Sequence, residues 1–417
     1  MGKHLWFKLA GVVAAAALIA GAGYVGATPA KAGVAHESQD GGQVRHNGNG
    51  ALLAAPALVV AVTRLMGQVA ESALPAAMSP RQLAGQRVIY GYSGLTPPAS
   101  LLSLIRAGDV GGVIFFGNNY RSKAQFTAAV RELQTANWAT TNPARAYPLL
   151  LMTDQEGGYI KRLPGAPYHS EKWIGARGTA VGRARQARQA GAGAAATLQS
   201  LGLNVNLAPV IDVYRAAGDF DDQYQRSYST NPEIVSSLGA DFISAEQGGG
   251  VAAAAKHFPG LGAAATSQNT DLRPVTIGLS KATLQSNDEQ PYQAAIAANV
   301  DLVMVSWAVY PNLGSSVPAG LSAPIVQGQL RDRLHFQGVT ITDAIGAGAL
   351  SSYGSSQARA LRAAQAGMQL ILASDSLGQG SQCLEALAIG YKTGRLPAAA
   401  FRATVTQILA LRASLKP

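Results

Sequence analysis

The chain has 417 residues, of which 48% are hydrophobic and 13% are charged, and its formal net charge is +10 at pH 7. This length and apolar content allow one large buried core, and the single cysteine, Cys383, excludes a disulfide within one chain. No block of lysine and arginine interleaved with aromatic residues is present, so nucleic acid is not an expected partner. The charge fits anionic cell-wall polymers or lipid head groups, and a merely soluble surface explains it equally well.

The N-terminal residues have the features of an export signal. Lys3 and Lys8 precede an almost uncharged stretch from Leu9 to Ala30, and residues 30–32 have the small-x-small form of a signal-peptidase site. We therefore expect residues 1–32 to be the signal peptide of an exported protein, extracellular or bound to the cell wall. The stretch is also long enough to span a bilayer, so an uncleaved membrane anchor that faces the protein outside is the alternative.

Two further segments precede the main domain. Residues 33–50 are polar and glycine-rich without periodicity, which predicts a flexible linker. Residues 51–79 are rich in alanine, leucine and valine, which predicts an N-terminal helical extension that lies against the domain.

Residues 80–417 alternate short β-branched runs with long alanine-rich stretches typical of helices. The eight predicted strands are Val88–Tyr92, Gly112–Phe116, Leu149–Thr153, Val205–Ala208, Val251–Ala255, Leu302–Ser306, Val339–Thr342 and Leu370–Ala373. Eight buried strands, each followed by a helix, predict an α/β fold of the (β/α)8 TIM-barrel type. A doubly wound open sheet is the runner-up, although neither a dinucleotide-binding nor a phosphate-binding glycine motif is present.

Polar side chains follow several of these strands at the point where each strand ends. In a barrel such residues meet at the C-terminal ends of the strands, where the active site forms. Glycoside hydrolysis needs a carboxylate that stabilises or traps an oxocarbenium-like centre, and Asp343 suits that role. The sugar hydroxyls need acceptors and cationic donors. Candidates for these contacts are Asp154, Arg162, Arg226, Lys256 and His257.

Each of these residues also has a purely structural interpretation. Asp343 is equally explained as the N-cap of the following helix, Asp154 as a turn cap, and Arg226 as a surface arginine. Their joint occurrence at successive strand ends favours the functional interpretation.

Five ordered motifs in residues 80–417 resemble glycoside hydrolase family 3, and within it the single-domain β-N-acetylglucosaminidases. The motifs are Asp154-Gln-Glu-Gly-Gly with Lys161-Arg162-Leu163, Asn206-Leu-Ala-Pro-Val-Ile-Asp212-Val213, Arg226-Ser-Tyr228, Lys256-His-Phe-Pro-Gly260, and Ile341-Thr-Asp343. The resemblance implies a retaining hydrolase that removes terminal β-linked N-acetylglucosamine from cell-wall glycans, as in peptidoglycan turnover.

The resemblance also assigns roles to individual residues. It implies that Asp343 is the nucleophile and that Asp154, Arg162, Arg226, Lys256 and His257 hold the sugar. It implies no metal and no organic cofactor, and we expect a monomer.

One departure from the family pattern concerns the acid/base group. Family members carry an Asp-His dyad shortly after the Lys-His-Phe-Pro-Gly motif, whereas in register this chain has Ser267 and Asn269. Neither side chain transfers a proton near neutral pH. Asp271, Glu156 or water is then the replacement acid, or the chain is a glycan-binding pseudoenzyme that keeps the sugar pocket without turnover.

Smaller departures from the family pattern are Tyr159, Trp307 and Ala344, which predict an altered pocket.

Overall fold

The computed structural model describes residues 74–415. The predicted signal peptide or anchor at 1–32 and the predicted linker at 33–50 lie outside the described residues, as does most of the predicted helical extension at 51–79. Of that extension, residues 74–77 are helical. Among the residues from 74 to 415, no helix combines the length and the apolar character that a membrane crossing requires.

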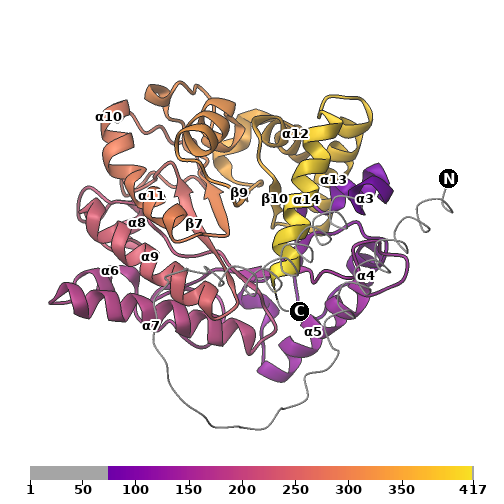
Figure 1. Ribbon diagram of the computed structural model, residues 1–417, viewed down its shortest axis with the longest axis horizontal. Helices are drawn as coiled ribbons and strands as arrows, with labels where there is room; N and C mark the ends of the chain where they lie inside the picture. The colour runs from indigo at the N-terminus through magenta and orange to yellow at the C-terminus, as the bar shows by residue number, and fades with distance from the viewer. Residues whose placement is uncertain (1–73, 416–417) are drawn as a thin grey trace, which may run out of the picture. The chain divides into compact units, whose positions relative to one another are not determined.

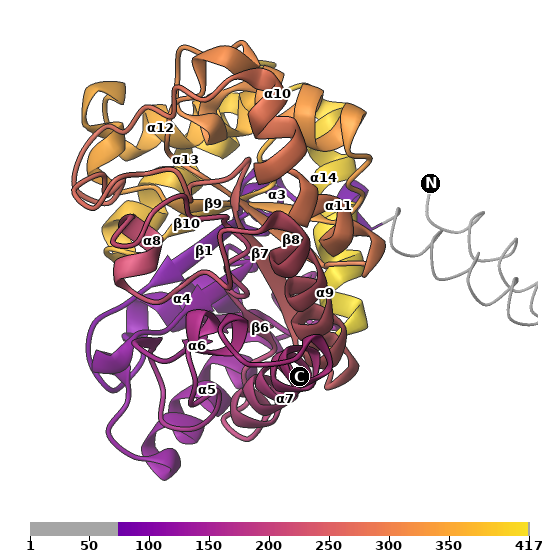
Figure 2. The ribbon, with the colours of Figure 1, turned by 90° about the vertical axis from the view of Figure 1, so that its left-hand side faces the viewer.

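The domain is built on a closed barrel of parallel strands, as the sequence predicts (Figures 1 and 2). Neighbouring strands around the barrel follow the order β1-β10-β9-β8-β7-β6-β3-β2. The barrel strands are β1 (Val88–Gly91), β2 (Gly112–Ile114), β3 (Leu150–Thr153), β6 (Val205–Asn206), β7 (Ala252–Phe258), β8 (Leu302–Val305), β9 (Val339–Ala344) and β10 (Leu370–Ala373). All eight predicted strands are therefore confirmed, and the open-sheet alternative is wrong.

Helices cover the outside of the barrel, as Figure 2 shows. They are α3 (Pro80–Gly85), α4 (Ala99–Arg106), α5 (Lys123–Asn137), α6 (Glu171–Gly175), α7 (Ala180–Gln199), α8 (Phe220–Gln223), α9 (Pro232–Gly248), α10 (Lys281–Thr283), α11 (Gln290–Ala297), α12 (Ser356–Ala366), α13 (Leu377–Lys392) and α14 (Ala398–Ser414). Several begin at a side chain that accepts a backbone N–H, such as Ser122 before α5 and Thr179 before α7. Such caps satisfy donors that the first turn of a helix leaves free.

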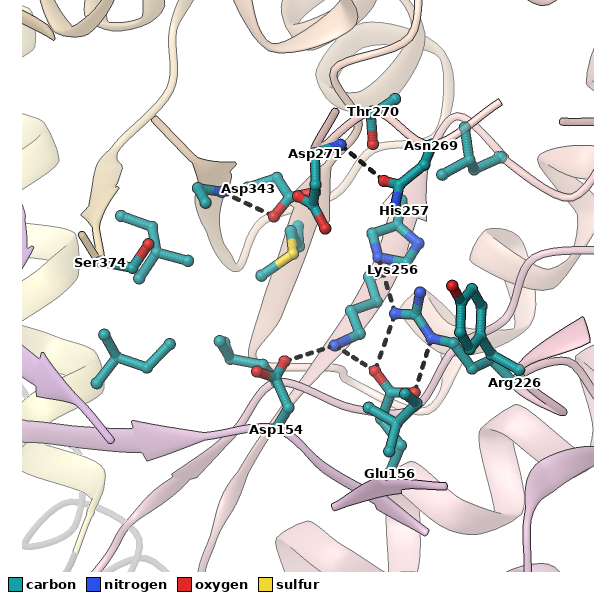
Figure 3. A pocket seen from close by; sticks show the side chains of 18 of the residues that line it. Asp154, Glu156, Arg226, Lys256, His257, Asn269, Thr270, Asp271, Asp343 and Ser374 are labelled. Atoms are coloured by element: carbon teal, nitrogen blue, oxygen red, sulfur yellow. Dashed lines mark hydrogen bonds and ion pairs between the residues drawn. The ribbon is translucent and has the colours of Figure 1, made fainter. Parts of the chain in front are cut away.

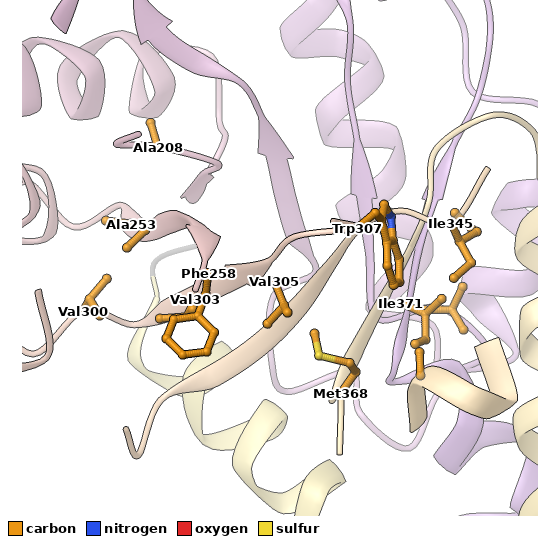
Figure 4. Close-up of a cluster of buried hydrophobic side chains, with 14 of the residues drawn as sticks. Ala208, Ala253, Phe258, Val300, Val303, Val305, Trp307, Ile345, Met368 and Ile371 are labelled. Carbon is orange, nitrogen blue, oxygen red and sulfur yellow. The ribbon is translucent and has the colours of Figure 1, made fainter. Parts of the chain in front are cut away.

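Alternating side chains of the strands form two layers of core. Ile89, Leu150 and Leu302 belong to the cluster inside the barrel. Residues such as Val303, Val305 and Ile371 face the helices, where they join Met368 and Trp307 (Figure 4). Both layers are apolar, so the strands read in the sequence as continuous hydrophobic runs.

The last helix, α14, closes one end of the barrel. Its Ile408 and Leu411 belong to the interior cluster. The buried Arg412 donates from Nε to Pro148 O at 2.7 Å and from Nη2 to Tyr147 O at 2.9 Å, just before β3 begins. Helix α14 covers the ends where the strands begin. The polar side chains that reach the barrel therefore do so at the opposite, C-terminal ends of the strands.

Candidate active site

A pocket of about 290 Å³ lies at the C-terminal ends of the strands, and all six predicted site residues line it. They come from five separate places in the chain: Asp154 after β3, Arg162 after the hairpin strand β5 (Ile160–Lys161), Arg226 after α8, Lys256 and His257 in β7, and Asp343 in β9. The fold thus brings together residues that span nearly 190 positions of sequence, from Asp154 to Asp343. Their roles in catalysis and binding remain predictions.

The turn after β3 is fixed by buried amide side chains. Asn206 Oδ1 accepts the backbone N–H of Gln155 at 2.9 Å, and Asn206 Nδ2 donates to Gln155 O at 3.1 Å. Gln155 Nε2 in turn donates to Leu163 O and Ala166 O, both at 3.0 Å. Because Gln155 is held on both sides, the neighbouring Asp154 and Glu156 have fixed positions at the pocket.

A short antiparallel hairpin, β4 (Gln155–Gly157) with β5, was missed by the sequence analysis. Its turn needs two glycines, because Gly157 has φ 117° and Gly158 has φ 55°. A Cβ on Gly157 would stand 2.4 Å from His169 O, and a Cβ on Gly158 would stand 2.5 Å from Ser170 Cβ. Tyr159 at the hairpin tip is 68% exposed and does not line the pocket, so its side chain contributes nothing to the lining.

A chain of alternating charges crosses the pocket floor (Figure 3). Lys256 Nζ lies 2.9 Å from Asp154 Oδ1 and 2.7 Å from Glu156 Oε1. Glu156 then accepts two hydrogen bonds from Arg226, each at 2.9 Å, in a bidentate pair. Arg162 Nε stands 3.6 Å from the other oxygen of Asp154.

These pairings keep both carboxylates of the floor ionised. Burial alone raises the pKa of Asp154, but the charges of Lys256 and Arg162 outweigh it and hold that pKa at about 2. Burial also raises the pKa of Glu156, and Arg226 and Lys256 outweigh it to give a lowered pKa. Glu156 is therefore a poor proton donor, which argues against the hypothesis that it replaces the missing acid.

The ring of His257 lies between the carboxyl group of Asp212 and the guanidinium group of Arg226. Its Nδ1 lies 2.7 Å from Asp212 Oδ2, and its Nε2 lies 3.2 Å from Arg226 Nη2. Burial, aided by the charge of Arg226, lowers the pKa of His257 to about 4, so the ring is neutral near pH 7. A neutral ring whose Nε2 faces the Arg226 guanidinium has no proton to give on that side.

Within the described part of the chain, the ligand atoms of Asp212, Asp221 and His257 lie within 4.8 Å of one another and could in principle bind a cation. Those of Asp212 are already engaged: Asp212 accepts the backbone N–H groups of His257 and Leu261 as well as the His257 ring. Arg226 Nη1 lies 3.4 Å from Asp221. We therefore assign this group to holding His257 and Arg226 in place.

Asp343 stands apart from the charged floor, as the last residue but one of β9. Its Oδ1 accepts the backbone N–H of Ala344 at 2.7 Å. Burial raises the pKa of Asp343, and the negative charge of Asp271 raises it further, against the opposing effect of His257. Trp307 is fully buried behind this strand and donates from Nε1 to Ala344 O at 2.9 Å, so it supports the backbone next to Asp343.

Ser267 and Asn269, which the sequence resemblance places in register with the family dyad, have different positions. Ser267 is exposed and does not line the pocket. Asn269 lines the pocket, but its Oδ1 accepts the backbone N–H of Asp271 at 2.8 Å. Lining residues absent from the predicted sugar-binding set include Phe116, which follows β2, and Phe220 and Tyr224, which lie at the two ends of the short helix α8. No local pattern marks them, because only the fold brings these elements together.

Comparison with known proteins identifies the family. Residues 81–411 match the glycosyl hydrolase family 3 N-terminal domain. The chain belongs to glycosyl hydrolase family 3. A relative described as an uncharacterized secreted glycosyl hydrolase, from Arthroderma benhamiae, is 42% identical over 84% of this chain and 98% of its own length. A β-hexosaminidase of Thioalkalivibrio sulfidiphilus is 33% identical over 66% of this chain and 77% of its own length.

Solved structures of the family have the same barrel. The family 3 β-N-acetylglucosaminidase of Paenibacillus sp. str. FPU-7 superposes with a TM-score of 0.75 and 32% identity, over 81% of this chain and 63% of that protein. The β-N-acetylhexosaminidase of Beutenbergia cavernae superposes with a TM-score of 0.73 and 28% identity, over 81% of this chain and 99% of that protein. The chain is thus a family 3 glycosyl hydrolase related to β-N-acetylhexosaminidases.

Proposed function

We propose that this chain is an exported β-N-acetylhexosaminidase that removes terminal β-linked N-acetylglucosamine from cell-wall glycans by a retaining mechanism, with Asp343 as nucleophile. The observation that carries the proposal is the position of Asp343 in the pocket of about 290 Å³, facing a floor of paired charges. The relatives named as β-hexosaminidases and β-N-acetylglucosaminidases support the substrate class. The features of residues 1–32 and a relative described as secreted support export.

The pocket offers two kinds of group, and they suit two tasks. The charged floor of Asp154, Lys256, Glu156 and Arg226 presents fixed acceptors and donors that suit sugar hydroxyls. Asp343 is not part of an ion pair in the described part of the chain. A carboxylate without a cationic partner is free to approach the anomeric carbon as its positive charge develops.

The proposal is tested with an aryl β-N-acetylglucosaminide that carries a good leaving group. Wild type is expected to hydrolyse it, with the β anomer as the first product in ¹H NMR, and Asp343→Asn is expected to lose at least about a thousandfold in kcat/KM. The matched control is Asp375→Asn, which changes an exposed carboxylate after the neighbouring strand β10 that does not line the pocket. It is expected to keep wild-type activity.

A second candidate function is supported by the exposed Ser267 and by Asn269, which leave the dyad positions without a proton-transfer group. In that case the pocket binds glycan without cleaving it. Calorimetric binding of N-acetylglucosamine fragments together with no turnover of the aryl substrate by wild type would favour this pseudoenzyme and refute the hydrolase.

A further inference from the structure

We propose that Asp271 is the general acid/base of this site and takes over the task that the Asp-His dyad performs in similar proteins. The inference rests on the proposed hydrolase function and names a further catalytic residue for it. A retaining glycosidase needs one carboxylate as nucleophile and a second group that protonates the leaving oxygen.

Asp271 lies in the same pocket as Asp343. Figure 3 shows both carboxylates on the side of the pocket away from Asp154 and Glu156. The same view (Figure 3) shows the carboxyl group of Asp271 beside that of Asp343, and the negative charge of Asp271 adds to the effect of burial in raising the pKa of Asp343. Asp271 is an exposed residue of the loop after β7, so water reaches its carboxyl from outside.

The Asp271 loop is attached to the loop that follows Asp343. Gly348 N donates to Asp271 O at 2.7 Å, and Ala349 N donates to Thr270 O at 2.9 Å. A Cβ on Gly348 would stand 2.3 Å from Leu272 O, so only glycine permits this close approach. Together with the bond from Asp271 N to Asn269 Oδ1, these contacts fix the position of Asp271 relative to β9.

The other titratable groups of the pocket have partners that prevent this role. Asp154 and Glu156 are bound to Lys256, and the ring of His257 lies between Asp212 and Arg226. Burial alone lowers the pKa of Lys256 and of Arg226, but the neighbouring carboxylates outweigh it and raise both pKa values, so these two cations keep their protons near neutral pH. Arg162 is paired with Asp154. In the described part of the chain, no hydrogen bond and no ion pair engages the carboxyl of Asp271, which leaves it available to a substrate oxygen.

The two neighbouring carboxyls favour a single shared proton, because two like charges at close range disfavour full ionisation. Desolvation by the pocket walls raises the pKa of Asp271, although the residue as a whole is exposed; Arg226 opposes this rise and Asp154 adds to it. Asp343 receives a backbone N–H at 2.7 Å that stabilises its ionised form, whereas no backbone N–H of residues 74–415 donates to the carboxyl of Asp271. The proton therefore belongs on Asp271 and the negative charge on Asp343, as an acid and a nucleophile require.

Both steps of a retaining mechanism can proceed with only Asp343, Asp271 and one water molecule besides the substrate. An oxygen of Asp343 attacks the anomeric carbon while the glycosidic C–O bond breaks, and the leaving oxygen takes the proton of Asp271. Asp271, now a carboxylate, removes a proton from water, whose oxygen attacks the anomeric carbon and breaks the ester to Asp343. The sugar leaves with its original configuration, and Asp271 holds the proton again. In the ester the charge of Asp343 is absent, which lowers the pKa of Asp271 and suits its second role as base.

The experiment compares Asp271→Asn with wild type on two substrates, the N-acetylglucosamine β-1,4-disaccharide and the activated aryl glycoside. Loss of a general acid is expected to lower kcat/KM on the disaccharide by about 10²- to 10⁴-fold. On the aryl substrate kcat/KM is expected to change by less than about tenfold, because its leaving group needs little protonation. The matched control is Ser267→Ala, at the position that the resemblance aligns with the aspartate of the family dyad. This variant is expected to keep the wild-type kcat/KM on both substrates.

Azide provides a readout that a merely structural role would not produce. It attacks the glycosyl ester without needing a base, so it is expected to raise kcat of Asp271→Asn on the aryl substrate and to yield the β-glycosyl azide. Wild type is expected to form none. Asp271→Ala, which leaves room for azide, is the second variant if Asp271→Asn does not fold, as judged by thermal unfolding.

Three results would overturn the role of Asp271 while leaving the proposed hydrolase intact: full activity of the variant on the disaccharide, equal losses on both substrates, or no azide product. A wild type inactive on the aryl glycoside would instead refute the proposed function, and the role of Asp271 with it.

Discussion

Replacing Glu156 by glutamine tests whether the two buried cations of the pocket depend on one shared carboxylate. Glu156 accepts from Arg226 at 2.9 Å through both oxygens and lies 2.7 Å from Lys256 Nζ. The side chains of Glu156 and Lys256 are each only 2% exposed, and that of Arg226 is 13% exposed. Glutamine has nearly the same shape, so the substitution removes the charge and keeps the packing.

The expected cost follows from this burial. Removing one partner of a buried ion pair typically destabilises a protein by about 3–5 kcal/mol, because the remaining charge is left without compensation. An unfolding entropy of about 2.1 cal/mol/K per residue over roughly 340 described residues gives about 0.7 kcal/mol/K. The expected fall in Tm at pH 7 is therefore about 4–7 °C.

The pH dependence of that difference tests its electrostatic cause. The pKa of folded Glu156 is lowered, so its stabilisation is fully present above the unfolded value of about 4.3 and is lost as pH falls through the folded value. Thermal unfolding by circular dichroism should show the gap between wild type and Glu156→Gln shrink below about pH 4. The control is Glu385→Gln, since the Arg81–Glu385 pair is exposed and is worth less than about 1 kcal/mol. A gap below about 1 kcal/mol that does not change with pH would refute the reasoning.

Two further predictions concern the pocket floor and the support of strand β9. Asp154→Asn should raise KM and lower kcat/KM by about ten- to a hundredfold, because a charged hydrogen bond to a sugar is worth about 1.5–3 kcal/mol. It should also lower Tm, because the buried Lys256 loses one of its two carboxylate partners. Steady-state kinetics that show an unchanged KM would contradict the binding role of Asp154. Trp307→Phe should lower the free energy of unfolding, measured in urea, by about 1–3 kcal/mol, because Ala344 O loses its donor at 2.9 Å. The control is Trp138→Phe, whose side chain is 52% exposed and whose free energy of unfolding should stay within about 0.5 kcal/mol of wild type.

The barrel could be predicted from the sequence because its strands are buried on both faces. The predicted run Leu370–Ala373 coincides with β10, and Val339–Thr342 differs from β9 only by the two residues at its end. Predicted strand Val251–Ala255 ended too early, because β7 continues through Lys256 and His257 to Phe258. Charged residues interrupt the apolar pattern there, and only the carboxylates of other loops explain why they belong to a buried strand.

The site could be predicted as a set of residues but not as a set of contacts. Strand ends converge in a barrel, so the six predicted residues were expected to share a pocket. The bidentate partner of Arg226 is Glu156, 70 positions away, and no local spacing signals such a pair. The hairpin of β4 and β5 was also hidden, because strands of three and two residues are too short to show alternation.

The position of the proposed acid/base residue could not be found by aligning motifs alone. Counting from Lys256-His257 points to Ser267 and Asn269, and at both positions the proton-transfer group is absent. In the fold, Ser267 is exposed, whereas Asp271 lines the pocket because Gly348 and Ala349 hold its loop against the end of β9. The path of that loop depends on residues nearly 80 positions further along the chain, and no motif records it. A missing motif residue is therefore weak evidence against turnover when another carboxyl reaches the same pocket, and this is the reason to compare Asp271→Asn with Ser267→Ala before assigning the chain to the pseudoenzymes.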